Sequence, residues 1–122
     1  MAKKILIADD SLFMRRMLKD ILSAEEKYEI IEAESGSKAL QQFKKEDPDL
    51  TFLDIIMPEG EEEGITVLKE IKKLYSRAKV VMITAVGQDS IMEECKKHGA
   101  IDYIVKPFDE EKIIATAKKY LG

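Results

Sequence analysis

Short apolar runs alternate with longer segments of helical periodicity along the chain. Five runs rich in β-branched residues predict strands at Lys4–Ala8, Glu29–Ala33, Leu50–Leu53, Val80–Thr84 and Ile101–Val105. Five amphipathic segments of helical period predict helices at Ser11–Ser23, Ser35–Lys45, Gly64–Tyr75, Asp89–His98 and Asp109–Tyr120. Most of the runs are too continuously apolar for strands with one face in water. The alternation therefore predicts an α/β domain with a doubly wound, five-stranded parallel sheet and five helices.

The residues between these segments agree with the predicted boundaries. Ser11, Ser35 and Asp109 each stand at the start of a helical segment, where a short polar side chain caps free backbone N–H groups. Gly99 follows a basic stretch, as expected at the C-terminal end of a helix. Pro48 separates the second helix from the third strand. The sequence has no internal repeat and no linker, so we expect residues 1–122 to form a single domain.

Composition narrows the class of protein. The chain is 45% hydrophobic and 36% charged, which is typical of a globular domain. Its apolar runs are too short for a transmembrane span or a signal peptide, so we expect no membrane insertion. The single cysteine, Cys95, cannot form an internal disulfide, and we expect a cytoplasmic protein. The single histidine, His98, argues against most Ser-His-Asp and Cys-His catalytic schemes.

Charge argues against nucleic acid as a partner. The formal net charge is −4, whereas binding to DNA depends on neutralising its phosphates. One local basic cluster is formed by Arg15, Arg16 and Lys19 in the first helical segment. We interpret this cluster as a solvated helix face, because charge runs at helical spacing usually face water.

The residues that finish the predicted strands are the strongest functional signal. In an open parallel α/β sheet the ligand site lies outside the carboxyl ends of the strands. The first strand ends in Asp9 and Asp10, the third in Asp54, the fourth in Thr84 and the fifth in Lys106. Each residue has a structural explanation by itself. Their joint placement at one edge of the sheet favours a functional site.

These residue types fit phosphoryl transfer assisted by a metal ion. Two adjacent carboxylates are costly unless a cation or a proton lies between them. Carboxylate oxygens suit Mg²⁺, which is usually held by one or two carboxylates together with a substrate phosphate. A third carboxylate, Asp54, can then act as a covalent nucleophile toward phosphorus, with Thr84 and Lys106 as donors on the other side.

Four motifs carry a resemblance to a known family. They are ILIADDS, LDIIMP, ITA and DYIVKPF, which begin at Ile5, Leu53, Ile83 and Asp102. Together they are highly specific, and with them the chain closely resembles the response-regulator receiver domains over essentially its whole length. Among these it is most similar to the stand-alone chemotaxis regulators. The resemblance implies a flavodoxin-like sheet with strand order 2-1-3-4-5.

The resemblance also implies a role for each acidic position. Asp54 matches the phosphoacceptor, and Asp10 matches a direct Mg²⁺ ligand. Asp9 matches a carboxylate that holds the metal largely through water. Ile56 matches the position whose backbone carbonyl completes the metal site, so its apolar side chain does not prevent binding.

A second set of positions matches the switch of the family. Thr84 matches the hydroxyl that moves toward the phosphoryl group, and Lys106 matches the ammonium that contacts it. Tyr103 matches an aromatic residue that turns inward when Thr84 moves, although strand aromatics are more often packing residues. The resemblance also implies that the peptide bond between Lys106 and Pro107 is cis, in keeping with the rule that ordered cis bonds precede proline.

The resemblance implies partners as well as chemistry. A histidine kinase would donate the phosphoryl group, and the output would pass through the face formed by the fourth helix, fifth strand and fifth helix. For a chemotaxis protein the output partner would be the flagellar motor switch or a phosphatase. No DNA-binding segment follows Gly122, and no apolar heptad argues for a dimer, so we expect a monomer that signals through protein contacts.

The chain departs from the family pattern in two places. The loop EGEEEG at Glu59–Gly64 is longer than usual by about two residues. Glu63 stands in it where an Asp is expected, and we interpret the loop as solvated. Ile56 and Val86, which flank the site, are apolar where many relatives are polar. We hypothesise that this shields the attacking water and lengthens the life of the aspartyl phosphate.

Other functions remain open at this point. A phosphorelay intermediate would use the same residues. A Mg²⁺-dependent phosphohydrolase would also use an aspartyl nucleophile, but normally at the end of the first strand with a second Asp two positions on, where this chain has Ser11. A flavodoxin-like electron carrier would need a first loop rich in Gly and hydroxyl residues. A receiver that binds without being phosphorylated is disfavoured, because no acidic or lysine position is missing.

Overall fold

The structure, a computed structural model, describes residues 2–24 and 27–122. Strands and helices alternate strictly along these residues. The strands are β1 (Lys3–Ala8), β2 (Tyr28–Ala33), β3 (Leu50–Leu53), β4 (Val80–Thr84) and β5 (Asp102–Val105). The helices are α1 (Leu12–Ser23), α2 (Gly36–Glu46), α3 (Glu63–Leu74), α4 (Asp89–Lys97) and α5 (Glu110–Leu121). The predicted elements are confirmed, each boundary lying within one residue of its predicted position.

The caps show why the helices begin and end where they do. Ser11 and Ser35 accept hydrogen bonds from the backbone N–H groups three residues further on, as predicted. Asp109 precedes α5 in an extended conformation, but its side chain makes no capping hydrogen bond, so that prediction was only half right. After α4, Gly99 has a φ of 100°, the left-handed conformation that often follows a helix. Asp47, the residue after α2, is also left-handed, with a φ of 48°.

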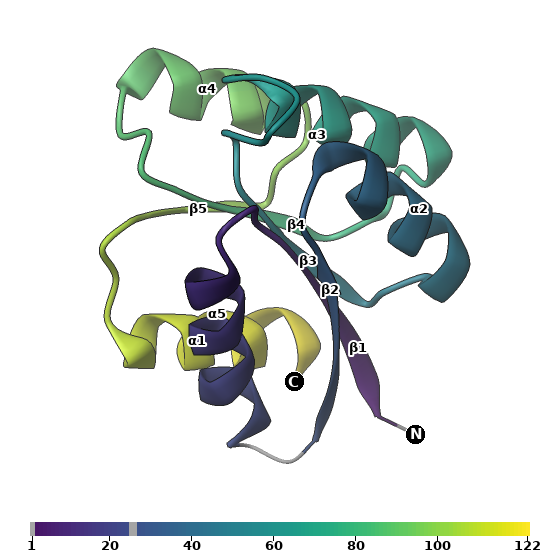
Figure 1. Ribbon diagram of the computed structural model, residues 1–122, viewed down its shortest axis with the longest axis vertical. Helices are drawn as coiled ribbons and strands as arrows, with labels where there is room; N and C mark the ends of the chain where they lie inside the picture. The colour runs from purple at the N-terminus through teal and green to yellow at the C-terminus, as the bar shows by residue number, and fades with distance from the viewer. Residues whose placement is uncertain (1, 25–26) are drawn as a thin grey trace.

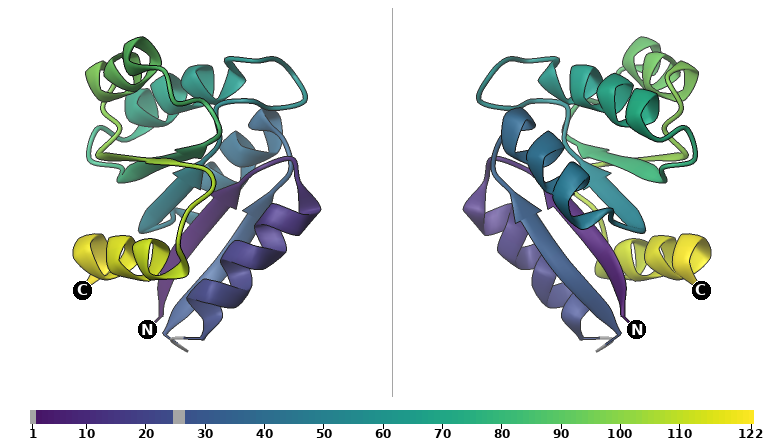
Figure 2. Two further views of the ribbon diagram at one scale, coloured as in Figure 1. Left: turned by 90° about the vertical axis from the view of Figure 1, so that its left-hand side faces the viewer. Right: turned by 90° about the vertical axis from the view of Figure 1, so that its right-hand side faces the viewer.

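The five strands form one parallel sheet in the order β2-β1-β3-β4-β5, as the resemblance implied. Helices α2, α3 and α4 cover one face, and α1 and α5 cover the other (Figure 1). Figure 2 shows the resulting three layers from both sides. Alternate strand residues serve the two faces: Leu6 packs toward α2–α4, and Ile5 and Ile7 pack toward α1 and α5.

The register of the sheet brings the predicted site residues together. Ala8 of β1 pairs with Leu53 of β3, so Asp9 and Asp54 leave neighbouring strands side by side. Thr84 of β4 pairs with Val105 of β5, so Lys106 follows at the same edge. Residues far apart in the chain therefore meet because parallel strands end together.

Within the described ranges no helix combines the length and the apolar character that crossing a bilayer requires. The peptide bond between Lys106 and Pro107 is cis, as expected.

Candidate functional site

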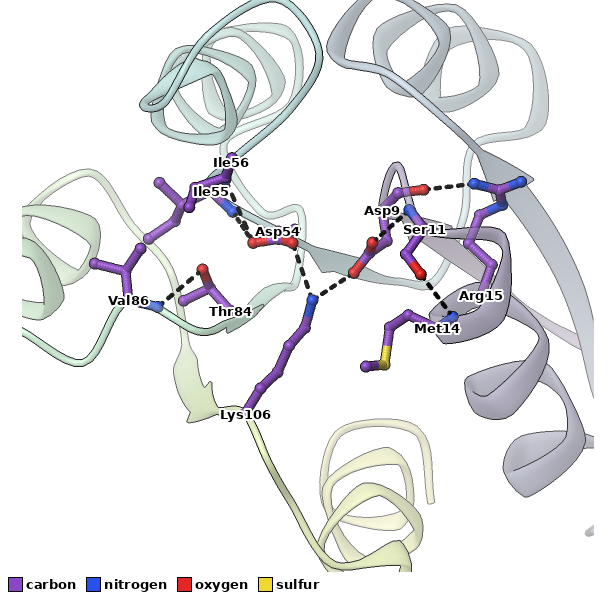
Figure 3. A network of polar contacts seen from close by, with 10 residues as sticks. All are labelled: Asp9, Ser11, Met14, Arg15, Asp54, Ile55, Ile56, Thr84, Val86 and Lys106. Carbon is purple, nitrogen blue, oxygen red and sulfur yellow. Dashed lines mark hydrogen bonds and ion pairs between the residues drawn. The ribbon is translucent and has the colours of Figure 1, made fainter.

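A lysine joins two buried carboxylates at the carboxyl edge of the sheet. The Lys106 Nζ lies 2.7 Å from Asp9 Oδ2 and 3.0 Å from Asp54 Oδ2 (Figure 3). Only 3% of the Asp9 side chain, 9% of the Asp54 side chain and 16% of the Lys106 side chain are exposed. Ion pairs at such depth are held by hydrogen bonds with little screening from water. The residues that directly follow β1, β3 and β5 thus form a single polar centre.

The charges in this centre are not balanced. Burial raises the pKa of the Asp9 carboxyl, because hydrogen bonds from Lys106 and from the Ser11 N–H offset only part of the desolvation. Burial acts against the charged form of Lys106, but its hydrogen bonds to Asp9 and Asp54 outweigh it and raise the pKa of the ammonium. One ammonium serves two buried carboxylates, so a further cation would be stabilised here.

Asp10 completes a group of ligands that can hold a metal ion. One carboxylate oxygen from each of Asp9, Asp10 and Asp54 lies within 4.8 Å of the others. Asp9 and Asp54 are buried and Asp10 is exposed, which leaves the cluster open to solvent on one side. The donor set is all oxygen, and hard divalent cations prefer such ligands. The predicted acidic cluster is therefore present in the geometry.

Backbone groups hold the other side of Asp54. Its Oδ1 accepts hydrogen bonds from the N–H groups of Ile55 at 2.7 Å and Ile56 at 3.3 Å. Helix α3 begins against this segment, because the Gly64 N–H donates to the Ile55 carbonyl at 2.7 Å. A Cβ on Gly64 would lie 2.0 Å from the Asp54 carbonyl oxygen, so only glycine permits this approach. The sequence analysis did not identify this requirement.

Thr84 and Tyr103 are linked through the backbone of Val86. The fully buried Thr84 accepts a hydrogen bond from the Val86 N–H at 3.3 Å. Figure 3 shows Thr84 between Val86 and the Asp54–Lys106 pair. The Tyr103 hydroxyl donates to the Val86 carbonyl at 2.5 Å, and its half-buried ring packs on the core under α2–α4. Burial raises the pKa of Tyr103 to about 12, which keeps the hydroxyl protonated as a donor.

Arg15 contradicts the interpretation of the basic cluster. Its side chain is 10% exposed, and its Nη1 donates to the Asp9 carbonyl at 2.7 Å. Its Nε donates to Glu32 Oε1 at 3.2 Å. Only Arg16 and Lys19 form an exposed face, and Lys19 lies 3.8 Å from Glu32. Arg15 shares the buried face of α1, which its spacing from the apolar positions of the helix already indicated.

The acidic loop is also more structured than predicted. The side chain of Glu59 accepts hydrogen bonds from the N–H groups of Gly36 and Ser37 at the start of α2. The interpretation of Glu59–Gly64 as a merely solvated loop was therefore wrong for Glu59, although Glu61 and Glu62 are exposed. No local sequence pattern indicated this contact, because Glu59 is far along the chain from Gly36 and Ser37.

Comparisons with known proteins agree with this geometry. Residues 5–118 match the model of the response regulator receiver domain. The chain is 44% identical over 122 residues to the chemotaxis protein CheY of Bacillus subtilis (strain 168), covering 100% of both chains. It is 37% identical over 121 residues to sporulation initiation phosphotransferase F of the same organism, covering 99% of this chain and 95% of that protein.

A solved structure agrees as well. The crystal structure of the CheX-CheY-BeF3-Mg+2 complex from Borrelia burgdorferi matches with a TM-score of 0.88 and 33% identity, covering 98% of this chain and 90% of that chain. Sequence and fold thus point to the same family. The chain therefore belongs to the response regulator receiver domains and is a phosphorylation-activated response regulator.

Proposed function

We propose that Asp54 is the residue that accepts the phosphoryl group, and that residues 1–122 act as a single receiver domain. One observation carries this assignment: Asp54 shares the Lys106 ammonium with Asp9 and keeps its second oxygen fixed by two backbone N–H groups. A nucleophile held between a cation and backbone donors is already oriented for attack. Asp9 also contacts Lys106 and one backbone N–H group, that of Ser11, whereas Asp54 accepts from two.

The donor is a histidine kinase. A carboxylate oxygen of Asp54 attacks the phosphorus of a phosphohistidine, the new O–P bond forms as the N–P bond breaks, and the imidazole nitrogen keeps the electron pair. Lys106 neutralises charge on the transferred oxygens, and the Thr84 hydroxyl donates to them. Lys106 and Thr84 already lie at the same edge of the sheet as Asp54, so the transfer requires no large rearrangement of the strands.

The residues present fit Mg²⁺. We assign Asp9, Asp10, Asp54 and the backbone carbonyl of Ile56 as the groups that hold it, Asp9 largely through water. The oxygen-only donor set and the surplus of buried negative charge support this assignment. The ion would supply the positive charge that phosphoryl transfer needs on the side opposite Lys106.

The output is a change in protein contacts. Phosphorylation draws Thr84 toward Asp54, and because the Val86 backbone joins Thr84 to Tyr103, the β4–α4 loop and the aromatic ring respond together. We assign the contact surface to α4, β5 and α5. The exposed apolar side chains of Ile101 and Val105 beside and on β5 support this surface.

The cellular role that we propose is chemotaxis in the cytoplasm, with the flagellar motor switch or a phosphatase as the partner. The likeness to CheY over the whole chain supports it. The likeness to sporulation initiation phosphotransferase F supports a second role, that of a single-domain phosphorelay intermediate. We expect a monomer that does not bind DNA and does not turn over a separate substrate.

The test is the intact mass of the protein after incubation with acetyl phosphate and Mg²⁺. We expect one phosphoryl adduct that disappears with a chelator and in Asp54→Ala. Asp20→Ala, which removes an exposed carboxylate from α1, is the matched control and should keep the adduct.

The alternatives give different results. An adduct that persists in Asp54→Ala would overturn the assignment of the acceptor. Continued consumption of acetyl phosphate without an adduct would identify a phosphohydrolase. No adduct and no consumption would identify a receiver that signals without phosphorylation.

A further inference from the structure

The side chain of Glu59 bridges the β3–α3 loop and the start of helix α2. Its Oε1 lies 3.0 Å from the Gly36 nitrogen and its Oε2 lies 2.9 Å from the Ser37 nitrogen. The first N–H groups of a helix have no partner within the helix, and the positive end of the helix dipole favours a carboxylate there. These two hydrogen bonds lower the pKa of Glu59, so the carboxylate is charged at neutral pH.

Backbone hydrogen bonds within one turn connect the bridge to the site. The Met57 N–H donates to the Gly60 carbonyl at 3.1 Å, and the Gly60 N–H donates to the Met57 carbonyl at 3.0 Å. Glu59 therefore stands in a closed turn with hydrogen bonds across its base. The turn begins one residue after Ile56, whose N–H is bonded to Asp54. A displacement of Glu59 would therefore move the backbone that carries the Ile56 carbonyl, the assigned ligand.

A second contact holds the same two elements together. Glu63, the first residue of α3, packs against Gly36, where an added Cβ would lie 2.7 Å from the Glu63 Cγ. The start of α2 is therefore in contact with both ends of the acidic loop. A loop with both ends held has few conformations to lose when a ligand binds, which favours affinity.

We propose that Glu59 is a positioning residue, which caps α2 and thereby holds the Ile56 carbonyl where the metal site requires it. This inference rests on the proposed function, because it takes the metal site as given. It adds a coupling between that site and the start of α2. Coupling of this kind is reciprocal, so a bound metal should also make the hydrogen bonds at Gly36 and Ser37 more persistent.

The first test is a calorimetric titration of the full chain with Mg²⁺. We expect Glu59→Ala to weaken binding about fivefold, at the low end of ordinary coupling between sites. Glu61→Ala removes the same charge from the same loop, and Glu61 makes no hydrogen bond in the described part of the chain. It should change the affinity less than about twofold, because a solvated charge is largely screened. Glu59→Gln, which keeps one acceptor oxygen, should lie between the two alanine variants.

The second test is amide hydrogen exchange of the same proteins. Without Mg²⁺, Glu59→Ala should speed exchange at Met57 and Gly60, two amides that Glu59 does not itself bind. In the unaltered protein Mg²⁺ should slow exchange at Gly36 and Ser37. A change confined to α2 would show a helix cap without a positioning role and would overturn the inference.

The outcomes separate this inference from the proposed function. Equal Mg²⁺ affinities for Glu59→Ala and Glu61→Ala would overturn the positioning role and leave the metal site intact. Failure of the unaltered protein to bind Mg²⁺ would overturn the metal site, and the inference with it.

Discussion

The β1–α1 loop and the β3–α3 loop both bring carboxylates to one edge of the sheet, but different contacts hold them. The first loop is held by the buried Arg15, which donates to the Asp9 carbonyl, and by the Ser11 N–H, which donates to the Asp9 carboxylate. The second is held by the buried backbone contact of Gly64 and also by the exposed side chain of Glu59. Buried contacts resist disturbance, whereas an exposed one can respond to ligands.

The largest effect is expected where α3 touches the second loop. Gly64→Ala would place a Cβ 2.0 Å from the Asp54 carbonyl oxygen, and backbone cannot move aside cheaply. We expect the free energy of unfolding to fall by about 3 kcal/mol, measured by urea denaturation. Gly60→Ala, where nothing lies within 4 Å of an added Cβ, should change it by less than about 0.5 kcal/mol. Equal losses in the two variants would contradict the close approach.

A smaller loss of stability is expected when a contact of the first loop is removed. Arg15→Ala removes hydrogen bonds from a buried guanidinium to the Asp9 carbonyl and to Glu32. We expect urea denaturation to show a loss of about 2 kcal/mol in the free energy of unfolding. Arg16→Ala is the control, since Arg16 is exposed and should cost less than about 0.5 kcal/mol. If both variants cost the same, Arg15 does not act as a buried anchor.

Ile56 in the second loop and Val86 in the β4–α4 loop place two apolar side chains beside the site, and the lifetime of the phosphoryl group reports their effect. Ile56→Asn together with Val86→Glu would give an attacking water the hydrogen-bond partners that the present side chains lack. We expect the half-life of the phosphoryl group to fall about tenfold, which is about 1.4 kcal/mol in the barrier. Loss of the adduct is followed by intact mass. Leu74→Asn, an equally polar change at an exposed position of α3, should leave the half-life unchanged. No change in the double variant would refute the shielding hypothesis.

The smallest loss of stability is expected at the two serine caps, Ser11 and Ser35. Ser11→Ala removes the acceptor for the Met14 N–H and should cost about 1 kcal/mol of stability in thermal or urea unfolding. Ser35→Ala removes the equivalent acceptor on α2, but Glu59 also caps that helix. We expect it to cost about 0.5 kcal/mol, rising to about 1 kcal/mol when Glu59→Ala is present. Additive losses would mean that the two caps act independently.

Most of the fold and the central site could be predicted from sequence. The segments that form the strands and helices carry the hydrophobic periodicity of strands and helices in their own sequence. Each boundary was therefore predicted to within one residue. The convergence of Asp9, Asp54, Thr84 and Lys106 followed from a general rule, since parallel strands end at one edge. The Mg²⁺ site, the acceptor and the switch stay predictions, because their chemistry has to be measured on the protein.

By itself, the sequence determined which residues end the strands and therefore which chemistry gathers at the edge of the sheet. Only the tertiary structure decided how that edge is held: that Arg15 donates to the Asp9 carbonyl, that Glu59 caps α2, and that Gly64 must be glycine. The physical reason is that periodicity is a property of neighbours along the chain. A hydrogen bond or a close approach between two elements depends on how they pack, and no spacing within either element encodes its partner.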